Sequence, residues 1–189
     1  MCYYNRTIEN KKYKPNKKNG GNPPIPKDER VKAVPIGCGV CKECMAQKKR
    51  EWQVRLHEEI KHRTDGKFVT LTFSEESIEK LAKECETYEA NTIATKAVHD
   101  FTNRWIRKYK ETIHHWLITE LGHKNTERIH LHGILFTNKT ENEILERWGY
   151  GELYVGEYVN AKTINYIVKY VTKQDPDHKG NSFSHHSMS

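Results

Sequence analysis

The amino-acid sequence predicts an α+β domain, and three observations support this class. Residues 68–73 and 129–136 are short runs of strand length, rich in β-branched, aromatic or aliphatic side chains. Residues 44–62 and 91–110 carry apolar side chains three or four positions apart, which is the spacing of one helix face. Residues 115–121 are joined to 129–136 by a short, turn-rich link, so these two strands are expected to form an antiparallel hairpin.

Size and charge limit the possible classes of protein. The 189 residues suffice for one domain with appended segments, and 35% of them are hydrophobic whereas 30% are charged. A net charge of +7 attracts polyanions, so nucleic acid is the first partner to consider, with a merely basic soluble protein as the alternative. Because no apolar run could span a bilayer and no signal peptide is evident, a cytosolic location without a membrane partner is expected.

Residues 1–34 are expected to form an irregular basic arm. They are rich in Lys and Asn, and Gly20-Gly21 and a proline cluster interrupt them. Such an arm either contacts a phosphate backbone or is a solvated tail, and the sequence leaves both interpretations open.

A cysteine run follows the arm. Cys38, Cys41 and Cys44 form C-x-x-C-x-x-C, and in a reducing compartment clustered cysteines indicate metal ligands before disulfides. A structural Zn²⁺ requires four ligands, and Cys2 is the candidate for the fourth, with His57 or water as alternatives. Three reduced thiols without a metal remain the other possibility.

The next elements can be placed in chain order. Ser74 is expected to cap a helix, and the helix at 91–110 is expected to pack on a sheet. Residues 140–148 predict a short helix and 152–159 another strand. Within the strand at 68–73 the two faces differ, with Val69, Leu71 and Phe73 on one and Phe68, Thr70 and Thr72 on the other.

Two histidines one residue apart lie in the strand at 129–136. Side chains alternate across a strand, so His130 and His132 point to the same face, although such a pair is also ordinary on a half-buried strand. The expected hairpin brings Glu120 of the neighbouring strand close to both. Two imidazoles and one carboxylate make a credible divalent-cation site with open coordination positions.

Residues 161–173 predict an amphipathic helix. Its polar side carries Tyr166, Lys169, Tyr170 and Lys173, whereas aliphatic residues occupy the other side. A phenol with a pKa of about 10 is a poor nucleophile until neighbouring cations stabilise the phenolate. Two phenols one turn apart, each beside an ammonium group, suit attack on a phosphodiester, which leaves a phosphotyrosine and a free 3′ hydroxyl. The alternative is a helix whose tyrosines merely lie at its polar boundary.

Taken in order, the strand at 68–73, the His130-Leu131-His132 pair and Tyr166-x-x-x-Tyr170 resemble the three motifs of the HUH endonucleases, the initiators of rolling-circle replication. The cysteine run and the segment around the tyrosines are similar to those of the initiators of microviruses, small phages with circular single-stranded DNA. This resemblance covers nearly the whole chain up to about residue 179. Family members usually continue well beyond the tyrosine helix, so a short polar tail here is a departure that bears on origin recognition.

The resemblance implies a fold, an activity and partners. The fold is a central antiparallel sheet of about five strands flanked by helices, with residues 1–62 as the N-terminal arm, cysteine segment and first helix, 63–175 as the nuclease core and 176–189 as the tail. The activity is nicking of single-stranded origin DNA with Mg²⁺ or Mn²⁺ held by His130, His132 and Glu120. One tyrosine becomes linked to the 5′ phosphate, the second helps to cut and rejoin, and the host polymerase and helicase extend the 3′ end in the host cytoplasm.

Two other interpretations remain open. The chain could be a zinc-stabilised DNA-binding module without catalysis, in which basic and aromatic side chains hold single strands. It could also be a plasmid initiator or a transposase that uses the same chemistry.

Overall fold

The computed structural model describes residues 2, 4–121, 128–156, 159–172 and 184–187. The chain divides into two compact units, an N-terminal unit (Met1–Lys48) and a C-terminal unit (Lys49–Ser189). The division falls inside the first helix, whereas the sequence placed boundaries at residues 62 and 175. Those two boundaries, which concern functional segments, stay predictions.

The N-terminal unit contains short regular elements where an irregular arm was expected. Strands β1 (Arg6–Glu9) and β2 (Ala33–Ile36) pair antiparallel, with Arg6 opposite Ile36. Between them lie three 3-10 turns, η1 (Lys11–Tyr13), η2 (Lys17–Asn19) and η3 (Glu29–Lys32). Each turn begins at an Asn or Asp whose side chain accepts a hydrogen bond from the following backbone, which is how these residue types initiate turns.

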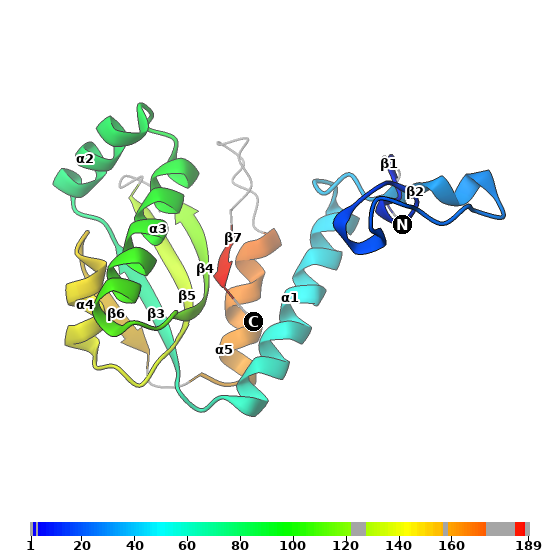
Figure 1. Cartoon of the computed structure of the whole chain (residues 1–189). Coiled ribbons are helices and arrows are strands. Elements are labelled where there is room, and N and C mark those ends of the chain that lie inside the picture. Colours follow the sequence, from blue (N-terminus) through cyan, green and yellow to red (C-terminus); the bar gives the residue numbers. More distant parts are fainter. Residues whose placement is uncertain (1, 3, 122–127, 157–158, 173–183, 188–189) are drawn as a thin grey trace. The chain divides into compact units, whose positions relative to one another are not determined.

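A five-stranded sheet in the order β6-β3-β5-β4-β7 forms the centre of the C-terminal unit (Figure 1). Its strands are β3 (Gly66–Thr72), β4 (His114–Leu121), β5 (Ile129–Phe136), β6 (Leu153–Gly156) and β7 (Ser184–Ser187). Every neighbouring pair is antiparallel. The α+β class, the antiparallel sheet and the expected hairpin of β4 and β5 are thereby confirmed.

Helices cover both faces of this sheet (Figure 1). Helices α2 (Glu75–Cys85), α3 (Ala90–Tyr109) and α4 (Glu141–Trp148) contribute to one hydrophobic core, with the β3 residues Val69 and Leu71. Helices α1 (Lys42–His62) and α5 (Ala161–Ile167) contribute to a second core on the opposite face. Tryptophans fill both cores, Trp105 and Trp148 in the first and Trp52 and Trp116 in the second.

Three elements differ from their expected form. The helix expected over 161–173 tightens after α5 into a 3-10 segment, η4 (Val168–Thr172), where β-branched side chains lower helix propensity. The strand expected over 152–159 is β6, which ends at Gly156. The fifth strand, β7, lies in the segment expected to be a polar tail, because its Ser and His residues carry no strand signal.

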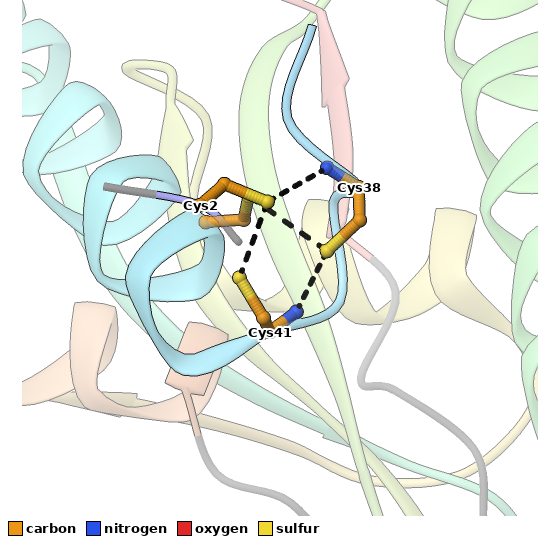
Figure 2. Close-up of side chains that lie close together, drawn as sticks. Cys2, Cys38 and Cys41 are labelled. Carbon is orange, nitrogen blue, oxygen red and sulfur yellow. Dashed lines mark hydrogen bonds between the residues drawn. The ribbon is translucent and has the colours of Figure 1, made fainter. Parts of the chain in front are cut away.

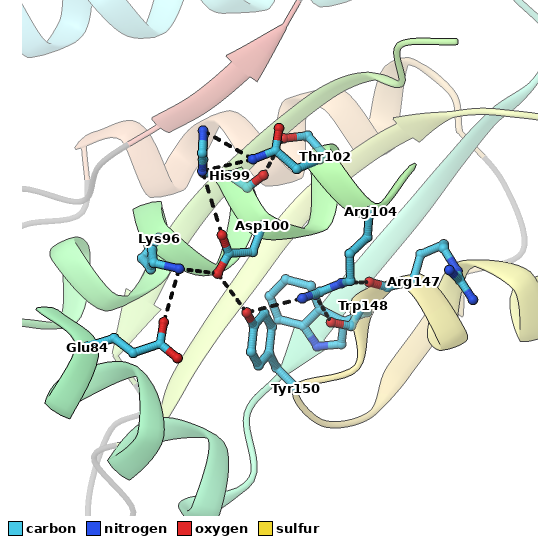
Figure 3. A network of polar contacts seen from close by, with 10 residues as sticks. Glu84, Lys96, His99, Asp100, Thr102, Arg104, Arg147, Trp148 and Tyr150 are labelled. Carbon is cyan, nitrogen blue, oxygen red and sulfur yellow. Dashed lines mark hydrogen bonds and ion pairs between the residues drawn. The ribbon is translucent and has the colours of Figure 1, made fainter. Parts of the chain in front are cut away.

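A polar network ties α2, α3 and the α4–β6 connection together (Figure 3). Arg104 donates hydrogen bonds to the carbonyl oxygens of Arg147 (2.7 Å) and Trp148 (2.5 Å), which are orphan acceptors at the end of α4. Tyr150 donates to Asp100 over 2.9 Å, and Asp100 also pairs with Lys96. The network fixes the chain as it leaves α4 and enters β6, one edge of the sheet.

Candidate functional site

The β4–β5 hairpin places the predicted histidines and glutamate together. Glu120 lies directly opposite His130, and the next pair along the same face is Ile118 opposite His132. Beyond this point the face becomes apolar and carries the second core. The site therefore lies where the apolar face of the sheet ends and its polar end begins.

His132 is held by contacts at both ring nitrogens. Its Nε2 lies 3.0 Å from Glu120 Oε2, and both side chains are only 16% exposed. Its Nδ1 is hydrogen-bonded to Thr70 Oγ1 over 2.9 Å, because Thr70 lies directly opposite His132 on β3. The sequence placed Thr70 on a polar face but did not connect it with the histidines, since the β3–β5 pairing could not be predicted.

His130 lies beside His132 with nearly parallel rings, 6.2 Å apart at an angle of 22°. Burial lowers the pKa of His130, and the neighbouring His132 lowers it further. A neutral imidazole is the form that ligates metals. Among the described residues, however, His130, His132 and Glu120 do not bring their three ligand atoms within 4.8 Å of one another, as a compact metal cluster does.

The two tyrosines lie against this group. The Tyr170 ring stacks on the His132 ring, with centroids 5.2 Å apart and an angle of 11°. The Tyr166 and Tyr170 hydroxyls are 2.8 Å apart, although Tyr170 belongs to the 3-10 segment. Lys169 lies over the Tyr166 ring, 5.9 Å from its centroid, whereas the predicted Lys173 lies outside the described residues. The aliphatic side of the segment is buried as expected.

Hydrogen bonding and burial keep the proton on Tyr170. Burial raises the pKa of Tyr170, and the hydrogen bond with Tyr166 and the charge and hydrogen bond of Glu120 raise it further. In this arrangement Tyr170 is a phenol rather than a phenolate. A positive charge at Glu120 would remove one of these causes.

A pocket of about 640 Å³ opens beside the histidines. It is lined by Thr70, Thr72, Phe73, Ser74, Glu120, Arg128, His130, His132, Gly151, Glu152 and Tyr154. Tyr154 is 59% exposed and donates a hydrogen bond to Glu152 over 2.6 Å. Sequence reasoning missed Arg128, Glu152 and Tyr154, because only the β3–β6 pairing brings β6 to this face.

The N-terminal unit carries a second candidate site, made by Cys2, Cys38, Cys41 and Cys44 (Figure 2). Their four Sγ atoms all lie within 4.8 Å of one another, so the cluster could hold a zinc ion. The Cys2–Cys41 and Cys38–Cys44 Sγ distances are 3.7 and 4.0 Å. Zn–S bonds of about 2.3 Å in a tetrahedron require S–S distances of about 3.8 Å. Cys2 is the fourth member, as expected, and the alternative His57 instead approaches Asn165 at 3.5 Å.

Backbone groups favour thiolates in this cluster. The backbone N–H groups of Val40 and Cys41 lower the pKa of Cys38 to about 6. The N–H of Cys44 favours the Cys41 thiolate as well, but burial and hydrogen bonds with the other thiols outweigh it and raise the pKa of Cys41 to about 12. Gly37 makes room for the cluster, because a Cβ there would come within 2.6 Å of Cys44 Sγ.

Comparison with protein families places the C-terminal unit. Residues 66–175 match the model of the ORF2 family of replication-associated proteins. The chain belongs to this family. The matched region includes the histidines, Glu120 and both tyrosines of this replication-associated protein, and it excludes the four cysteines. Comparison with curated proteins and with solved structures finds no match. Within the described ranges, every helix is too short or too polar to cross a bilayer.

Proposed function

We propose that this replication-associated protein initiates rolling-circle replication as a metal-dependent, site-specific endonuclease and strand transferase of single-stranded DNA. One tyrosine attacks a phosphodiester at the replication origin and keeps the 5′ phosphate. The released 3′ hydroxyl primes the host polymerase behind the host helicase. Family membership supports the replication role, and the resemblance to HUH endonucleases and microvirus initiators supports the chemistry.

The observation that carries this proposal is the contact between the phenols and the histidine–glutamate group. Tyr170 stacks on His132 at 5.2 Å, His132 lies 3.0 Å from Glu120, and the Tyr166 hydroxyl lies 2.8 Å from that of Tyr170. Both hydroxyls can therefore reach one phosphate. A helix with tyrosines merely at its boundary would not require them to stack on a histidine.

The residues fit a divalent cation in their donor types. Two imidazoles and one carboxylate would hold Mg²⁺ or Mn²⁺ and leave positions for phosphate oxygens. If His132 donates its Nδ1 proton to Thr70, its Nε2 keeps a lone pair for the cation. A bound cation would supply charge that polarises the scissile phosphate.

The protein side chains account for bonds and protons as follows. The phenol oxygen of Tyr166 or Tyr170 forms a bond to phosphorus, and the bond from phosphorus to the 3′ oxygen breaks. The phenol proton passes to a hydrogen-bonded neighbour, for which the other tyrosine and Glu120 lie within reach of Tyr170. The leaving 3′ oxygen takes up a proton and becomes the primer hydroxyl. The reverse attack by a 3′ hydroxyl rejoins the strand.

The test is formation of a covalent adduct. The full chain is incubated with Mn²⁺ and a randomised single-stranded DNA library labelled at its 3′ end, and denaturation-resistant adducts are recovered. Adduct formation is expected, and sequencing of the recovered DNA should give a common cleavage site. The double substitution Tyr166→Phe, Tyr170→Phe should abolish the adduct, and His132→Ala should lower its rate about 100- to 1,000-fold.

Tyr88→Phe is the matched control, because Tyr88 is 73% exposed and is not among the residues of the site. It should leave the adduct unchanged. An adduct that persists in the double Phe variant would refute tyrosine chemistry at this site. DNA binding without any adduct would support the non-catalytic DNA-binding interpretation, and a cleavage site from a plasmid or transposon would assign the same chemistry to that class.

A further inference from the structure

The net charge of the chain resides entirely in its N-terminal unit. Residues 1–48 contain 11 Lys and Arg but only 4 Asp and Glu, whereas residues 49–189 contain 21 of each kind. The N-terminal unit thus carries the full +7 of the chain, and the catalytic unit is neutral. A field that attracts polyanions therefore originates from the unit without the proposed chemistry.

Most of these cations lack an anionic partner. All 11 are exposed. Three form ion pairs within the unit, namely Lys14 with Glu9, Arg30 with Asp28 and Lys32 with Glu29. Between residues 2 and 48, leaving out position 3, the cations without an ion pair are Arg6, Lys11, Lys12, Lys17, Lys18, Lys27, Lys42 and Lys48.

The backbone that carries the central lysines is fixed by side-chain hydrogen bonds. Asn16 accepts from the N–H groups of Lys18 and Asn19, and its amide donates to the carbonyls of Lys11 and Lys14 at 2.7 and 2.8 Å. These bonds hold η1 and η2 together. Lys11, Lys12, Lys17 and Lys18 therefore project from one ordered loop rather than from a solvated tail.

Burial of apolar side chains does not explain this order. Of the residues described between 2 and 48, Met45 alone is buried. A unit of this size requires a staple, and the four cysteines provide one by joining Cys2 to the start of α1. The chain thus maintains a folded unit whose outstanding surface property is unpaired positive charge.

We propose that the N-terminal unit binds the phosphate backbone of DNA without sequence preference, through the four lysines of η1 and η2. This deepens the proposed function and rests on it for the choice of DNA as the polyanion. Tyr4, 74% exposed, adds a ring on which an unpaired base can stack. The unit would supply affinity, whereas the site on the sheet would supply the cut.

The experiment measures DNA affinity separately from cleavage. Fluorescence anisotropy of a labelled oligothymidylate follows binding to the full, zinc-loaded chain without added Mg²⁺ or Mn²⁺, at several salt concentrations. The quadruple variant K11Q/K12Q/K17Q/K18Q should bind at least about tenfold more weakly at 0.1 M salt. Its salt dependence should fall by up to about 3 in the slope of log K, because each phosphate contact contributes about 0.7 for single strands.

The matched control removes four exposed cations from the C-terminal unit, as K80Q/K83Q/R107Q/K108Q. It should change affinity less than threefold with an unchanged slope. Equal losses in both variants, or a loss in neither, would overturn the proposal. Adduct formation at saturating DNA should persist in the lysine variant, so a protein that binds in this way but never forms an adduct would refute the proposed chemistry alone.

Discussion

The cysteine cluster and the histidine–glutamate–tyrosine site are two candidate metal sites built in opposite ways. The four thiols lie within 4.8 Å of one another in a unit with almost no buried apolar side chains. The histidines and Glu120 extend from a sheet with a hydrophobic core on each face, and a pocket of about 640 Å³ opens beside them. Four soft ligands complete a tetrahedron and exclude substrate, whereas three mixed ligands leave positions for one.

The difference teaches what each metal would do. In the N-terminal unit an ion would replace a missing core, so its loss should be a loss of folding. In the C-terminal unit the fold is already supplied by packing, so loss of an ion there should affect chemistry and leave the structure intact. The predictions below test this contrast, starting with the largest effect.

Cys41→Ser should remove the zinc and unfold the N-terminal unit while the C-terminal unit remains folded. Mass spectrometry of the metal content should give about one zinc per chain in the parent protein and none in the variant. Limited proteolysis should then cleave within residues 1–48 and spare the sheet. Cys85→Ser is the control, because Cys85 lies outside the cluster and should leave the zinc content unchanged. A folded, protease-resistant N-terminal unit without zinc would remove the contrast.

Sequence reasoning succeeded where local pattern decides. The alternation of His130 and His132 fixes their shared face, and the short link to β4 fixes the hairpin that brings Glu120 opposite. Cys2 was predicted as the fourth thiol because a tetrahedral site needs one, and the cluster confirms it. These signals lie within one element or between neighbouring elements.

Sequence reasoning failed where non-local pairing decides. Thr70 contacts His132, and Tyr154 lines the pocket, only because β3 lies between β5 and β6, and no local pattern specifies that strand order. The order of the N-terminal turns was missed because it rests on asparagine side chains rather than on apolar periodicity. Strand β7 was missed for a similar reason, since its pairing with β4 supplies what its own residues lack.

Thr70→Val tests whether the histidine site is tuned from outside its ligands. Valine keeps the shape of threonine but removes the hydroxyl that lies 2.9 Å from His132 Nδ1. Mn²⁺ affinity, measured by calorimetry, should fall about 10- to 100-fold, because partners of this kind orient the imidazole. Raising the Mn²⁺ concentration should restore adduct formation.

Thr70→Ser retains the hydroxyl and should retain most of the Mn²⁺ affinity. A purely structural role for Thr70 would lower the melting temperature of the Val variant without changing its Mn²⁺ dependence. That outcome would weaken the view that this site, unlike the cysteine cluster, depends on the sheet for its tuning.

The Arg63–Asp65 pair provides the smallest effect and a reference free of metal chemistry. Hydrogen bonds from Arg63, at 2.6 and 2.9 Å, lower the pKa of Asp65 below its usual value of 3.8, although partial burial opposes them. Because the folded-state pKa is the lower one, the pair stabilises the fold above pH 3.8 and loses this contribution as the pH falls through the folded-state pKa. Asp65→Asn should therefore lower the free energy of unfolding by about 1 kcal/mol at pH 7, with the difference vanishing in acid. Urea unfolding at several pH values measures this, and an unchanged adduct rate at pH 7 would separate stability of the sheet from chemistry at its other end.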